Sequence, residues 1–466
     1  MNASNGRPAT AGSHPGTPRG PRTRGWTLRA WGLAAAGGVL AVTAALAQPP
    51  AAVPASASAP VATIEQKCAP LASPGLRPAI GQHLAKSPPA MAYPAKGVPF
   101  IDTVYGTCVV RMTEHDKEPP KGYARNDYSR RQPFNADDSR LLVSAQDGTW
   151  HLYDARTAEY VSPLRGLAGD AEPQWHPTNP DLLYYLPNSG IGMALMSINV
   201  RTGESRQVAD FSTRLKALWP SAGSAWTRSE GSPSADGRYW AFLVDSTDWQ
   251  GLGLFTYDLA ENRILAAYDL KSHGKGRPDH LSMSLSGQYV VVSWLDGPTA
   301  FTRDFKQPLK LQAKSEHSDL ALTADGDDAY VAIDYDSGGG PLFMTNLRTG
   351  VRTNLFDTYV RKTATALHVS GRASKRPGWV MVSTYGEGGA GGQQWLHGKL
   401  LAVQLKANPA IHNLGFHRSV RNGGWTSPVA SVNRDFTRVA FNSNWGNGSA
   451  TDINAYMMVL PPSLLR

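Results

Sequence analysis

The sequence has 466 residues, of which 41% are hydrophobic and 18% are charged, and its formal net charge is +9. Five of the positive charges lie in the first 47 residues, which contain no Lys, Asp or Glu, so subtracting five from nine leaves +4 for the rest; they are Arg7, Arg19, Arg22, Arg24 and Arg29. Because the remaining Lys and Arg residues are not clustered, the sequence excludes the basic surface typical of nucleic-acid-binding proteins.

Residues 1–47 predict a signal peptide. The basic stretch leads into the small, apolar run Trp31–Ala47, which has the length of a signal h-region and ends in Ala45-Leu46-Ala47. An uncleaved membrane anchor is the alternative, but the run is shorter than the ~20 apolar residues that a span usually needs. Residues 48–66 are rich in Pro, Ala and Ser and predict a disordered linker. We therefore expect an exported protein, periplasmic or secreted, with no membrane span in its mature chain.

Two cysteines, Cys68 and Cys108, follow early in the mature chain. In an exported protein an even number of cysteines favours a disulfide bond. Two unpaired buried thiols are the alternative. The bond would close a loop and stabilise the fold by roughly 4 kcal/mol in the chain-entropy model.

Residues 67–466 exceed the usual size of a single hydrophobic core, so they require several domains or a repeat architecture. A degenerate repeat is present, of the type apolar-x-Ser/Asn-x-Asp-Gly-x-apolar-apolar, and each copy is followed by a second apolar segment. The copies begin at Pro133, Trp175, Ser232, Leu281, Leu320, Leu367 and Ala430. Their spacing of about 40 to 60 residues suits the four-stranded blade of a β-propeller.

The apolar runs inside the repeats, such as YWAFLV and YVVVSWL, are short, continuous and rich in β-branched or aromatic residues, which is typical of buried strands. Asp-Gly pairs predict tight turns between the strands. Seven copies predict an all-β, seven-bladed propeller. An eight-bladed propeller is the alternative, because residues 209–230 and 391–425 could hold further strands. The segment Val98–Thr113 would pair with the last repeat and close the ring, which leaves no exposed sheet edge. We expect residues 67–466 to form one domain.

The A-D-G-R/S-Y/L-apolar segments and the LYD…TG turns that follow them resemble the blades of TolB-type propellers and, more loosely, those of oligogalacturonate lyases. The resemblance covers residues 95–460 and implies the fold, together with ligand or protein binding on one face of the ring. Such lyases carry a His-rich metal motif in a late blade. Here that region reads GGWTSPVASVNRDFTRVAFNSNWG and contains no His.

In a propeller the first strand of each blade lines the central channel, so a residue that enters this strand lies near the channel mouth, where ligands usually bind. Alignment of five successive repeats on their turns places an ionisable residue at this position in each, namely Arg131, Glu172, Glu230, His280 and Asp319. The pattern predicts a charged pocket. The alternative is that these are ordinary surface polar residues that precede buried strands.

Two chemical uses of this pocket are open. Glu230, His280 and Asp319 are candidate ligands of a divalent metal, although their spacing is not diagnostic. A polyuronate lyase would need a base that takes the proton next to a sugar carboxylate and a cation that offsets the carboxylate charge. For these roles we consider His280 or His317 as the base and Arg131 or Arg130 as the cation.

Aromatic residues give a further indication. Trp219 and Trp226 could present flat faces to a sugar at the rim, or they could pack between neighbouring blades. The sequence contains no G-x-S-x-G elbow, H-E-x-x-H zinc motif or phosphate-binding loop. We therefore predict a monomeric module that binds a protein or polysaccharide ligand at its channel mouth, with a polyuronate lyase that acts by β-elimination as the alternative.

Overall fold

The computed structural model describes residues 61–71, 87–228, 231–389 and 391–465. The predicted signal peptide, most of the predicted linker and Glu230 lie outside the described residues. The chain from Ala62 to Arg466 forms one compact unit, to which the description below applies. In the described part of the chain, no helix is long and apolar enough to cross a bilayer.

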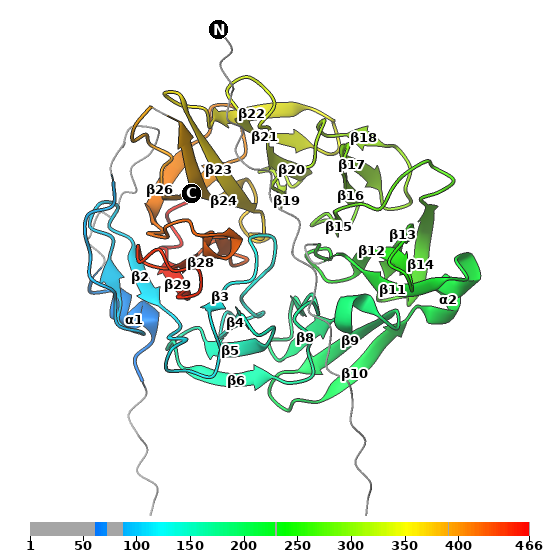
Figure 1. Ribbon diagram of the computed structural model, residues 1–466, viewed down its shortest axis with the longest axis horizontal. Helices are drawn as coiled ribbons and strands as arrows, with labels where there is room; N and C mark the ends of the chain where they lie inside the picture. Colours follow the sequence, from blue (N-terminus) through cyan, green and yellow to red (C-terminus); the bar gives the residue numbers. More distant parts are fainter. Residues whose placement is uncertain (1–60, 72–86, 229–230, 390, 466) are drawn as a thin grey trace, which may run out of the picture. The chain divides into compact units, whose positions relative to one another are not determined.

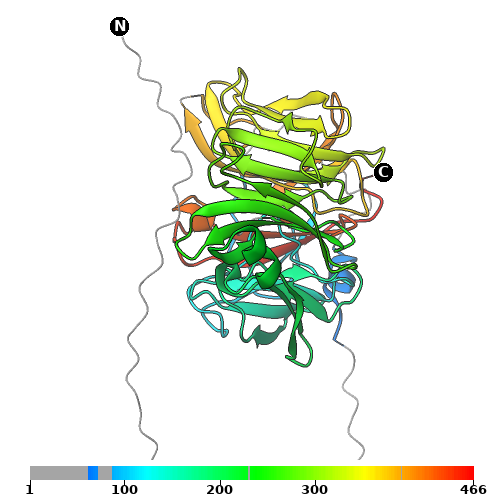
Figure 2. The same ribbon diagram turned by 90° about the vertical axis from the view of Figure 1, so that its right-hand side faces the viewer.

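This unit is built almost entirely from antiparallel sheets that follow one another around a central axis (Figure 1). Figure 2 shows the same arrangement from the side, with the sheet β11–β14 in front. In each of the five four-stranded sheets, neighbouring strands are consecutive in the sequence. They consist of β7 Gln174–Trp175, β8 Leu182–Tyr185, β9 Ala194–Asn199 and β10 Ser205–Asp210; β11 Ala222–Trp226, β12 Tyr239–Ser246, β13 Gly251–Asp258 and β14 Arg263–Asp269; β15 His280–Met283, β16 Tyr289–Trp294, β17 Gly297–Thr302 and β18 Leu309–Lys310; β19 Ser318–Leu322, β20 Asp328–Ile333, β21 Pro341–Asn346 and β22 Arg352–Asp357; and β23 Thr363–Ser370, β24 Trp379–Gly389, β25 Lys399–Gln404 and β26 Ile411–Phe416.

The sixth sheet has nine strands, which come from both ends of the described chain. They are β1 Phe100–Ile101, β2 Cys108–Arg111, β3 Ala124–Arg125, β4 Arg140–Ala145, β5 Trp150–Asp154, β6 Tyr160–Leu164, β27 Ser431–Val432, β28 Arg438–Ser443 and β29 Asn454–Val459. One parallel residue pair, Asn454 with Ala124, joins β29 to β3. Division of the sheet at this pair would give seven strand groups, but the sheet is continuous there, and the number of blades stays a prediction.

The two connections considered for an eighth blade hold strands of the sheets already described. Residues 209–230 contain β11, and residues 391–425 contain β25 and β26. The first connection also contains the short helix α2, Ser212–Leu218, whose Leu215 is buried. The described chain also contains two 3₁₀ turns, η1 Asn188–Gly190 and η2 Gly424–Thr426.

The predicted closure of the ring is confirmed. Strand β2 pairs antiparallel with β29, with Val110 opposite Met457, so a strand from early in the sequence completes a sheet from the end of the sequence. The predicted disulfide between Cys68 and Cys108 is also present. It links β2 to helix α1, Ile64–Cys68, whose Ile64 is fully buried. The compact unit therefore begins within the predicted linker, since Ile64 packs into the core and cannot be part of a disordered segment.

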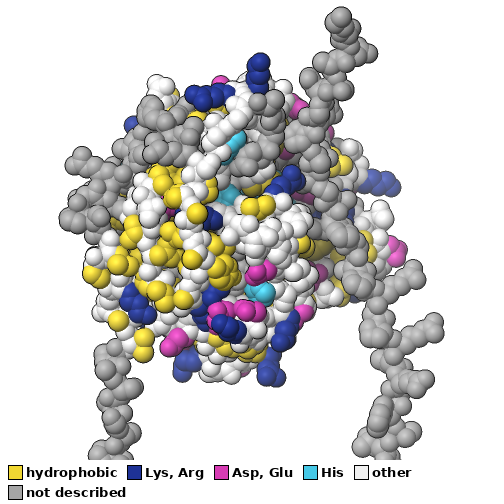
Figure 3. All heavy atoms as spheres, turned by 60° about the vertical axis from the view of Figure 1, so that its left-hand side comes forward, with side chains coloured by type: hydrophobic (Ala, Val, Ile, Leu, Met, Phe, Trp, Pro, Cys, Tyr) yellow, Lys and Arg dark blue, Asp and Glu magenta, His cyan; other side chains and the backbone are white. Residues whose placement is uncertain are grey.

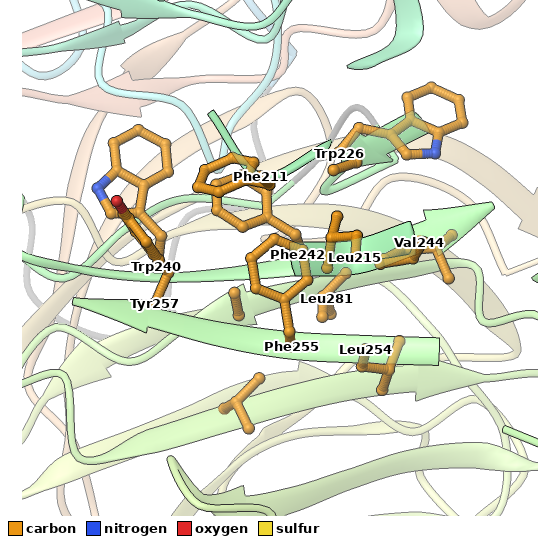
Figure 4. Close-up of a cluster of buried hydrophobic side chains, with 14 of the residues drawn as sticks. Phe211, Leu215, Trp226, Trp240, Phe242, Val244, Leu254, Phe255, Tyr257 and Leu281 are labelled. Atoms are coloured by element: carbon orange, nitrogen blue, oxygen red, sulfur yellow. The ribbon is translucent and has the colours of Figure 1, made fainter. Parts of the chain in front are cut away.

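Hydrophobic side chains fill the space within and between neighbouring sheets. Figure 4 shows the largest such cluster, in which Phe211 packs against Phe242, Phe255 and Tyr257 with ring centroids 4.9–5.3 Å apart. Leu281, from the next sheet, belongs to the same cluster. Burial of such continuous apolar runs on both faces of a strand is why the sequence shows little alternation of polar and apolar residues.

Hydrophobic side chains also gather on the side of the molecule that Figure 3 displays. Tyr93 and Val98, which precede β1, are among the exposed large hydrophobic residues of the described chain. Tyr93 is held in place, since its ring lies under the Arg111 guanidinium and its hydroxyl accepts from the Asn454 side chain. The segment before β1 is thereby fixed to the closing strands.

Candidate ligand site at the centre of the ring

A short stretch of chain with the sequence NDYSRRQ, residues 126–132, lies among the innermost strands of several sheets. We call it the central segment. The Ser431 hydroxyl of β27 donates to the Tyr128 carbonyl (2.8 Å), and the Ser232 hydroxyl, which precedes β12, donates to the Arg130 carbonyl (3.1 Å). The segment leaves β3 at Arg125 and returns to its own sheet at Phe134, which bridges to Leu141. The main chain of the segment is therefore held by residues of two other parts of the ring.

Arg130 of the central segment contacts His280, the first residue of β15, and Ser318, the first residue of β19. Its Nη1 donates to His280 Nε2 (2.7 Å), and its Nε donates to the Ser318 carbonyl. A guanidinium can only donate, so His280 Nε2 is the acceptor and the other ring nitrogen faces the Asp279 carboxylate at 3.2 Å. The hydrogen bond with His280 lowers the pKa of Asp279 to about 2. The arrangement holds the imidazole in one orientation.

A second group of rings lies next to the central segment. The His317 and His368 rings are 4.3 Å apart, and Tyr385 of β24 stacks on His368 at 4.5 Å and hydrogen-bonds to His317 Nδ1 (3.0 Å) through its hydroxyl. Tyr128 of the central segment meets the His368 ring edge-on at 5.4 Å. We call these four residues the aromatic cluster.

His368 is the buried member of this cluster, and its Nδ1 has no hydrogen-bond partner. Burial, together with the charges of His317, Arg130 and Arg125, holds the pKa of His368 well below its ordinary value, so the imidazole is neutral near pH 7. Buried polar atoms in folded proteins are nearly always hydrogen-bonded. The unsatisfied nitrogen is therefore a position at which a ligand could add a hydrogen bond.

The residues predicted from the repeat alignment occupy several different environments. The Arg131 guanidinium binds the Asp127 carboxylate (2.6 Å) and the Pro173 carbonyl (3.3 Å). Glu172 accepts from both the amide and the hydroxyl of Thr227 at 2.9 and 2.8 Å. Both residues thus connect neighbouring sheets. Their part in ligand binding stays a prediction, as does that of Glu230, which lies outside the described residues.

Asp319 forms a buried ion pair. Its carboxylate accepts two hydrogen bonds from the Arg372 guanidinium, at 2.7 and 3.1 Å, and one from the Gly371 amide at 2.7 Å. His317, two residues earlier, instead belongs to the aromatic cluster. The structure therefore brings His280 to Arg130 and His317 to His368, while Asp319 is used to join β19 to the chain that follows β23.

The predicted metal site stays a prediction, because its candidate ligand Glu230 lies outside the described residues. No three His, Cys, Asp or Glu side chains come together among them in a way that could hold a metal ion. Asp319 is paired with Arg372, and the rings of His317 and His368 contact each other at a tilt of 34°.

The two tryptophans predicted to face a ligand lie in the core. Trp219 is 8% exposed and donates to Asp269 (2.8 Å), and Trp226 is 9% exposed and donates to the buried Asp245 (2.8 Å). Both belong to the cluster of Figure 4. Packing between neighbouring sheets, the alternative considered for these residues, accounts for their positions, and we assign them no part in the site.

Sequence reasoning missed Tyr128 and Tyr385 as candidate site residues and named Arg130 only as an alternative to Arg131. Arg125 was not considered either. For Tyr128 and Arg130 a signal exists in the polar stretch NDYSRRQ, which lies just before the first repeat. Tyr385 lies in a different sheet and has no comparable signal. A polar insertion beside a buried strand often re-aims side chains toward a site.

Comparison with known proteins supports the fold. No family model and no curated protein matches the sequence. Among solved structures, an oligogalacturonate lyase in complex with manganese has a TM-score of 0.53 and 16% identity, over 80% of this chain and 100% of that one. This chain is a β-propeller. The propeller domain of a Myceliophteria thermophila Swd1 protein (TM-score 0.43, 15% identity, 71% of this chain and 97% of that one) and Kuenenia stuttgartiensis hydrazine synthase (0.44, 10%, 73% and 96%) also match.

Proposed function

We propose that this propeller is an exported binding module that holds an acidic sugar at the aromatic cluster. The observation that carries the proposal is the buried, neutral His368, whose unsatisfied Nδ1 lies within a stack of rings. Sugar hydroxyls can either donate to or accept from an imidazole nitrogen. Aromatic faces suit the apolar face of a sugar ring.

The charges around the cluster favour an acidic sugar over a neutral one. Arg125 and Arg130 both act electrostatically on His368. Arg421, an exposed residue, lies beside Gly386. Burial raises the pKa of Tyr385, and the positive charge of Arg421 partly opposes this rise. A carboxylate in this environment would gain from all three guanidinium groups.

Calorimetric titration with a galacturonate trimer, and with a neutral glucose trimer for comparison, tests the proposal. We expect binding of the acidic trimer only. Tyr385→Phe removes the hydroxyl that orients His317 and should weaken binding about tenfold, the effect of roughly 1.4 kcal/mol. Tyr257→Phe removes a hydroxyl bonded to Asn262 in another sheet and serves as the matched control. Equal affinity of the Tyr385→Phe variant and the unchanged protein, or no binding of any acidic sugar, would contradict the proposal.

A polyuronate lyase is the second candidate, and the His317–Tyr385 hydrogen bond favours it. In β-elimination the imidazole would take the proton next to the sugar carboxylate, the C–O bond to the next sugar would break, and the tyrosine hydroxyl would protonate the departing oxygen. His280 is less suited as the base, because its Nε2 accepts from Arg130. Ultraviolet absorbance from unsaturated uronate ends, lost in His317→Ala, would support the lyase. Bound sugar without any rise in absorbance would leave the binding module.

A further inference from the structure

The side chains of Tyr123, Arg125 and Trp425 pack against one another beside the central segment. The Arg125 guanidinium carbon lies 4.7 Å from the centre of a Trp425 ring and 5.1 Å from the centre of the Tyr123 ring. The Tyr123 and Trp425 rings are themselves 5.7 Å apart. Trp425 is 44% exposed, whereas Arg125 is 5% exposed. A buried cation thus lies against an aromatic side chain that reaches the surface.

No ion pair of Arg125 is found in the described part of the chain. Its Nη1 donates to the main-chain carbonyls of Asn126 (3.1 Å) and Asp127 (3.0 Å), and its Nε is buried without a hydrogen-bond partner. The Asp127 carboxylate is engaged by Arg131. A guanidinium remains charged at any ordinary pH, and a buried charge is normally paired. An anion from outside the protein would supply the missing partner.

The loop that presents Trp425 is fixed by its own hydrogen bonds. Thr426 Oγ1 accepts from the Asn422 amide (2.8 Å) and donates to the Gly423 carbonyl (2.8 Å), and the Ser419 hydroxyl donates to the Thr426 carbonyl (2.6 Å). The Asn444 side chain clamps Val420 through both its oxygen and its nitrogen, each at 2.8 Å. A preorganised surface loses little entropy when a ligand binds.

We propose that Tyr123, Arg125 and Trp425 form a subsite for one acidic sugar unit, with the sugar ring on Trp425 and its carboxylate at Arg125. The inference rests on the proposed function, because it places a further unit of the same acidic chain next to the aromatic cluster. Two observations connect the two places. The charge of Arg125 acts on His368, and the loop that presents Trp425 also carries Arg421 toward Tyr385.

Calorimetric titration of the whole protein with galacturonate as a monomer and as a trimer tests the subsite. We expect Trp425→Ala to weaken binding of the trimer at least tenfold and to leave binding of the monomer at the aromatic cluster unchanged. Arg125→Gln should weaken binding of the trimer more than that of the monomer, because Arg125 also favours an anion at the aromatic cluster. It should reduce the loss of trimer affinity on addition of salt, because one ion pair is removed. Trp249→Ala, at a tryptophan that is 40% exposed in another sheet, is the matched control and should bind both sugars normally.

The outcomes separate the two proposals. Unchanged trimer affinity in Trp425→Ala would overturn the subsite, and this exposed position keeps the test valid if Arg125→Gln fails to fold. Equal weakening for monomer and trimer would also overturn it, since Trp425 would then act at the aromatic cluster. Failure of the unchanged protein to bind either sugar would instead overturn the proposed function.

Discussion

His417, at the end of β26, is buried, and burial lowers its pKa to about 4. Between this value and the ordinary histidine pKa near 6.5, the unfolded chain binds a proton that the folded protein does not. The free energy of unfolding should therefore fall on acidification from about pH 6.5 to pH 4, by roughly 3 kcal/mol for this residue. The pKa of His368 is also lowered, so this residue too reduces the free energy of unfolding on acidification.

Urea unfolding at pH 7 and pH 4.5 measures this effect. His417→Asn keeps an acceptor for the Ser419 amide, which bonds to Nδ1 at 3.0 Å, but cannot take up a proton. We expect this variant to lose less stability than the unchanged protein over the same pH interval. His273→Asn, at an exposed histidine, should lose as much as the unchanged protein does. Equal losses of stability in His417→Asn and His273→Asn between pH 7 and pH 4.5 would contradict this explanation.

At the same scale, the sequence named some of the residues that surround the candidate site. It indicated His280 and His317 and considered Arg130, and all three lie at or beside the central segment. It favoured Arg131, because the repeat alignment assumes a continuous first strand. The structure instead has β3 at Ala124–Arg125 and a bonded insertion after it, which turns Arg131 toward Asp127. Contacts such as Tyr128 with His368 join residues far apart in the sequence and have no local signal.

Among the elements, helix α1 depends on the disulfide most directly. Cys68 ends this helix and Cys108 begins β2, so the bond fixes the helix to the strand that closes the ring. The double variant Cys68→Ser, Cys108→Ser should lose roughly 4 kcal/mol of stability, because its unfolded chain regains the freedom of the open loop.

Thermal unfolding of the double variant, compared with the unchanged protein with and without reductant, checks this. The reduced protein should unfold at the temperature of the double variant. Unchanged stability in both samples would mean that the remaining contacts of α1, such as the bond from the Ile64 amide to the Arg156 carbonyl, hold it without the disulfide.

Elements with a repeated pattern were predicted well, and isolated ones were not. The Asp-Gly turns formed as expected, with positive φ at Gly237 (71°) and Gly326 (85°). Helix α2 was not expected, since its sequence STRLKAL spans seven residues and is too short for a helical period to be visible. Its position depends on tertiary packing of Leu215 in the core of Figure 4.

For the whole molecule, closure of the ring depends on the pairing of β2 with β29, which joins a strand from early in the sequence to a sheet from its end. Met457, in the middle of β29, lies opposite both Val110 of β2 and Ala440 of β28. Proline at this position removes a main-chain donor and does not fit a central strand. We expect Met457→Pro to lose at least about 4 kcal/mol of stability, in the range of severe core defects.

Limited proteolysis and thermal unfolding detect the opened ring. Val161→Pro is the control, because Val161 lies in the outermost strand β6 at a register shift and is exposed. Val161→Pro should lose much less stability than Met457→Pro. Equal effects of the two prolines would show that the contact between β2 and β29 is not what holds the ring together.

The same pairing also limits when the protein can fold. During synthesis β2 emerges early, yet its partner strand leaves the ribosome only after all the other sheets have been made. Until then β2 has no neighbour on the β29 side, and the ring stays open however much of the chain has condensed. Contacts between residues so distant in the sequence form slowly. Completion of the ring is therefore a late step of folding, because it requires β29 to have been synthesised. Until then the unpaired side of β2 can form hydrogen bonds with strands of other molecules.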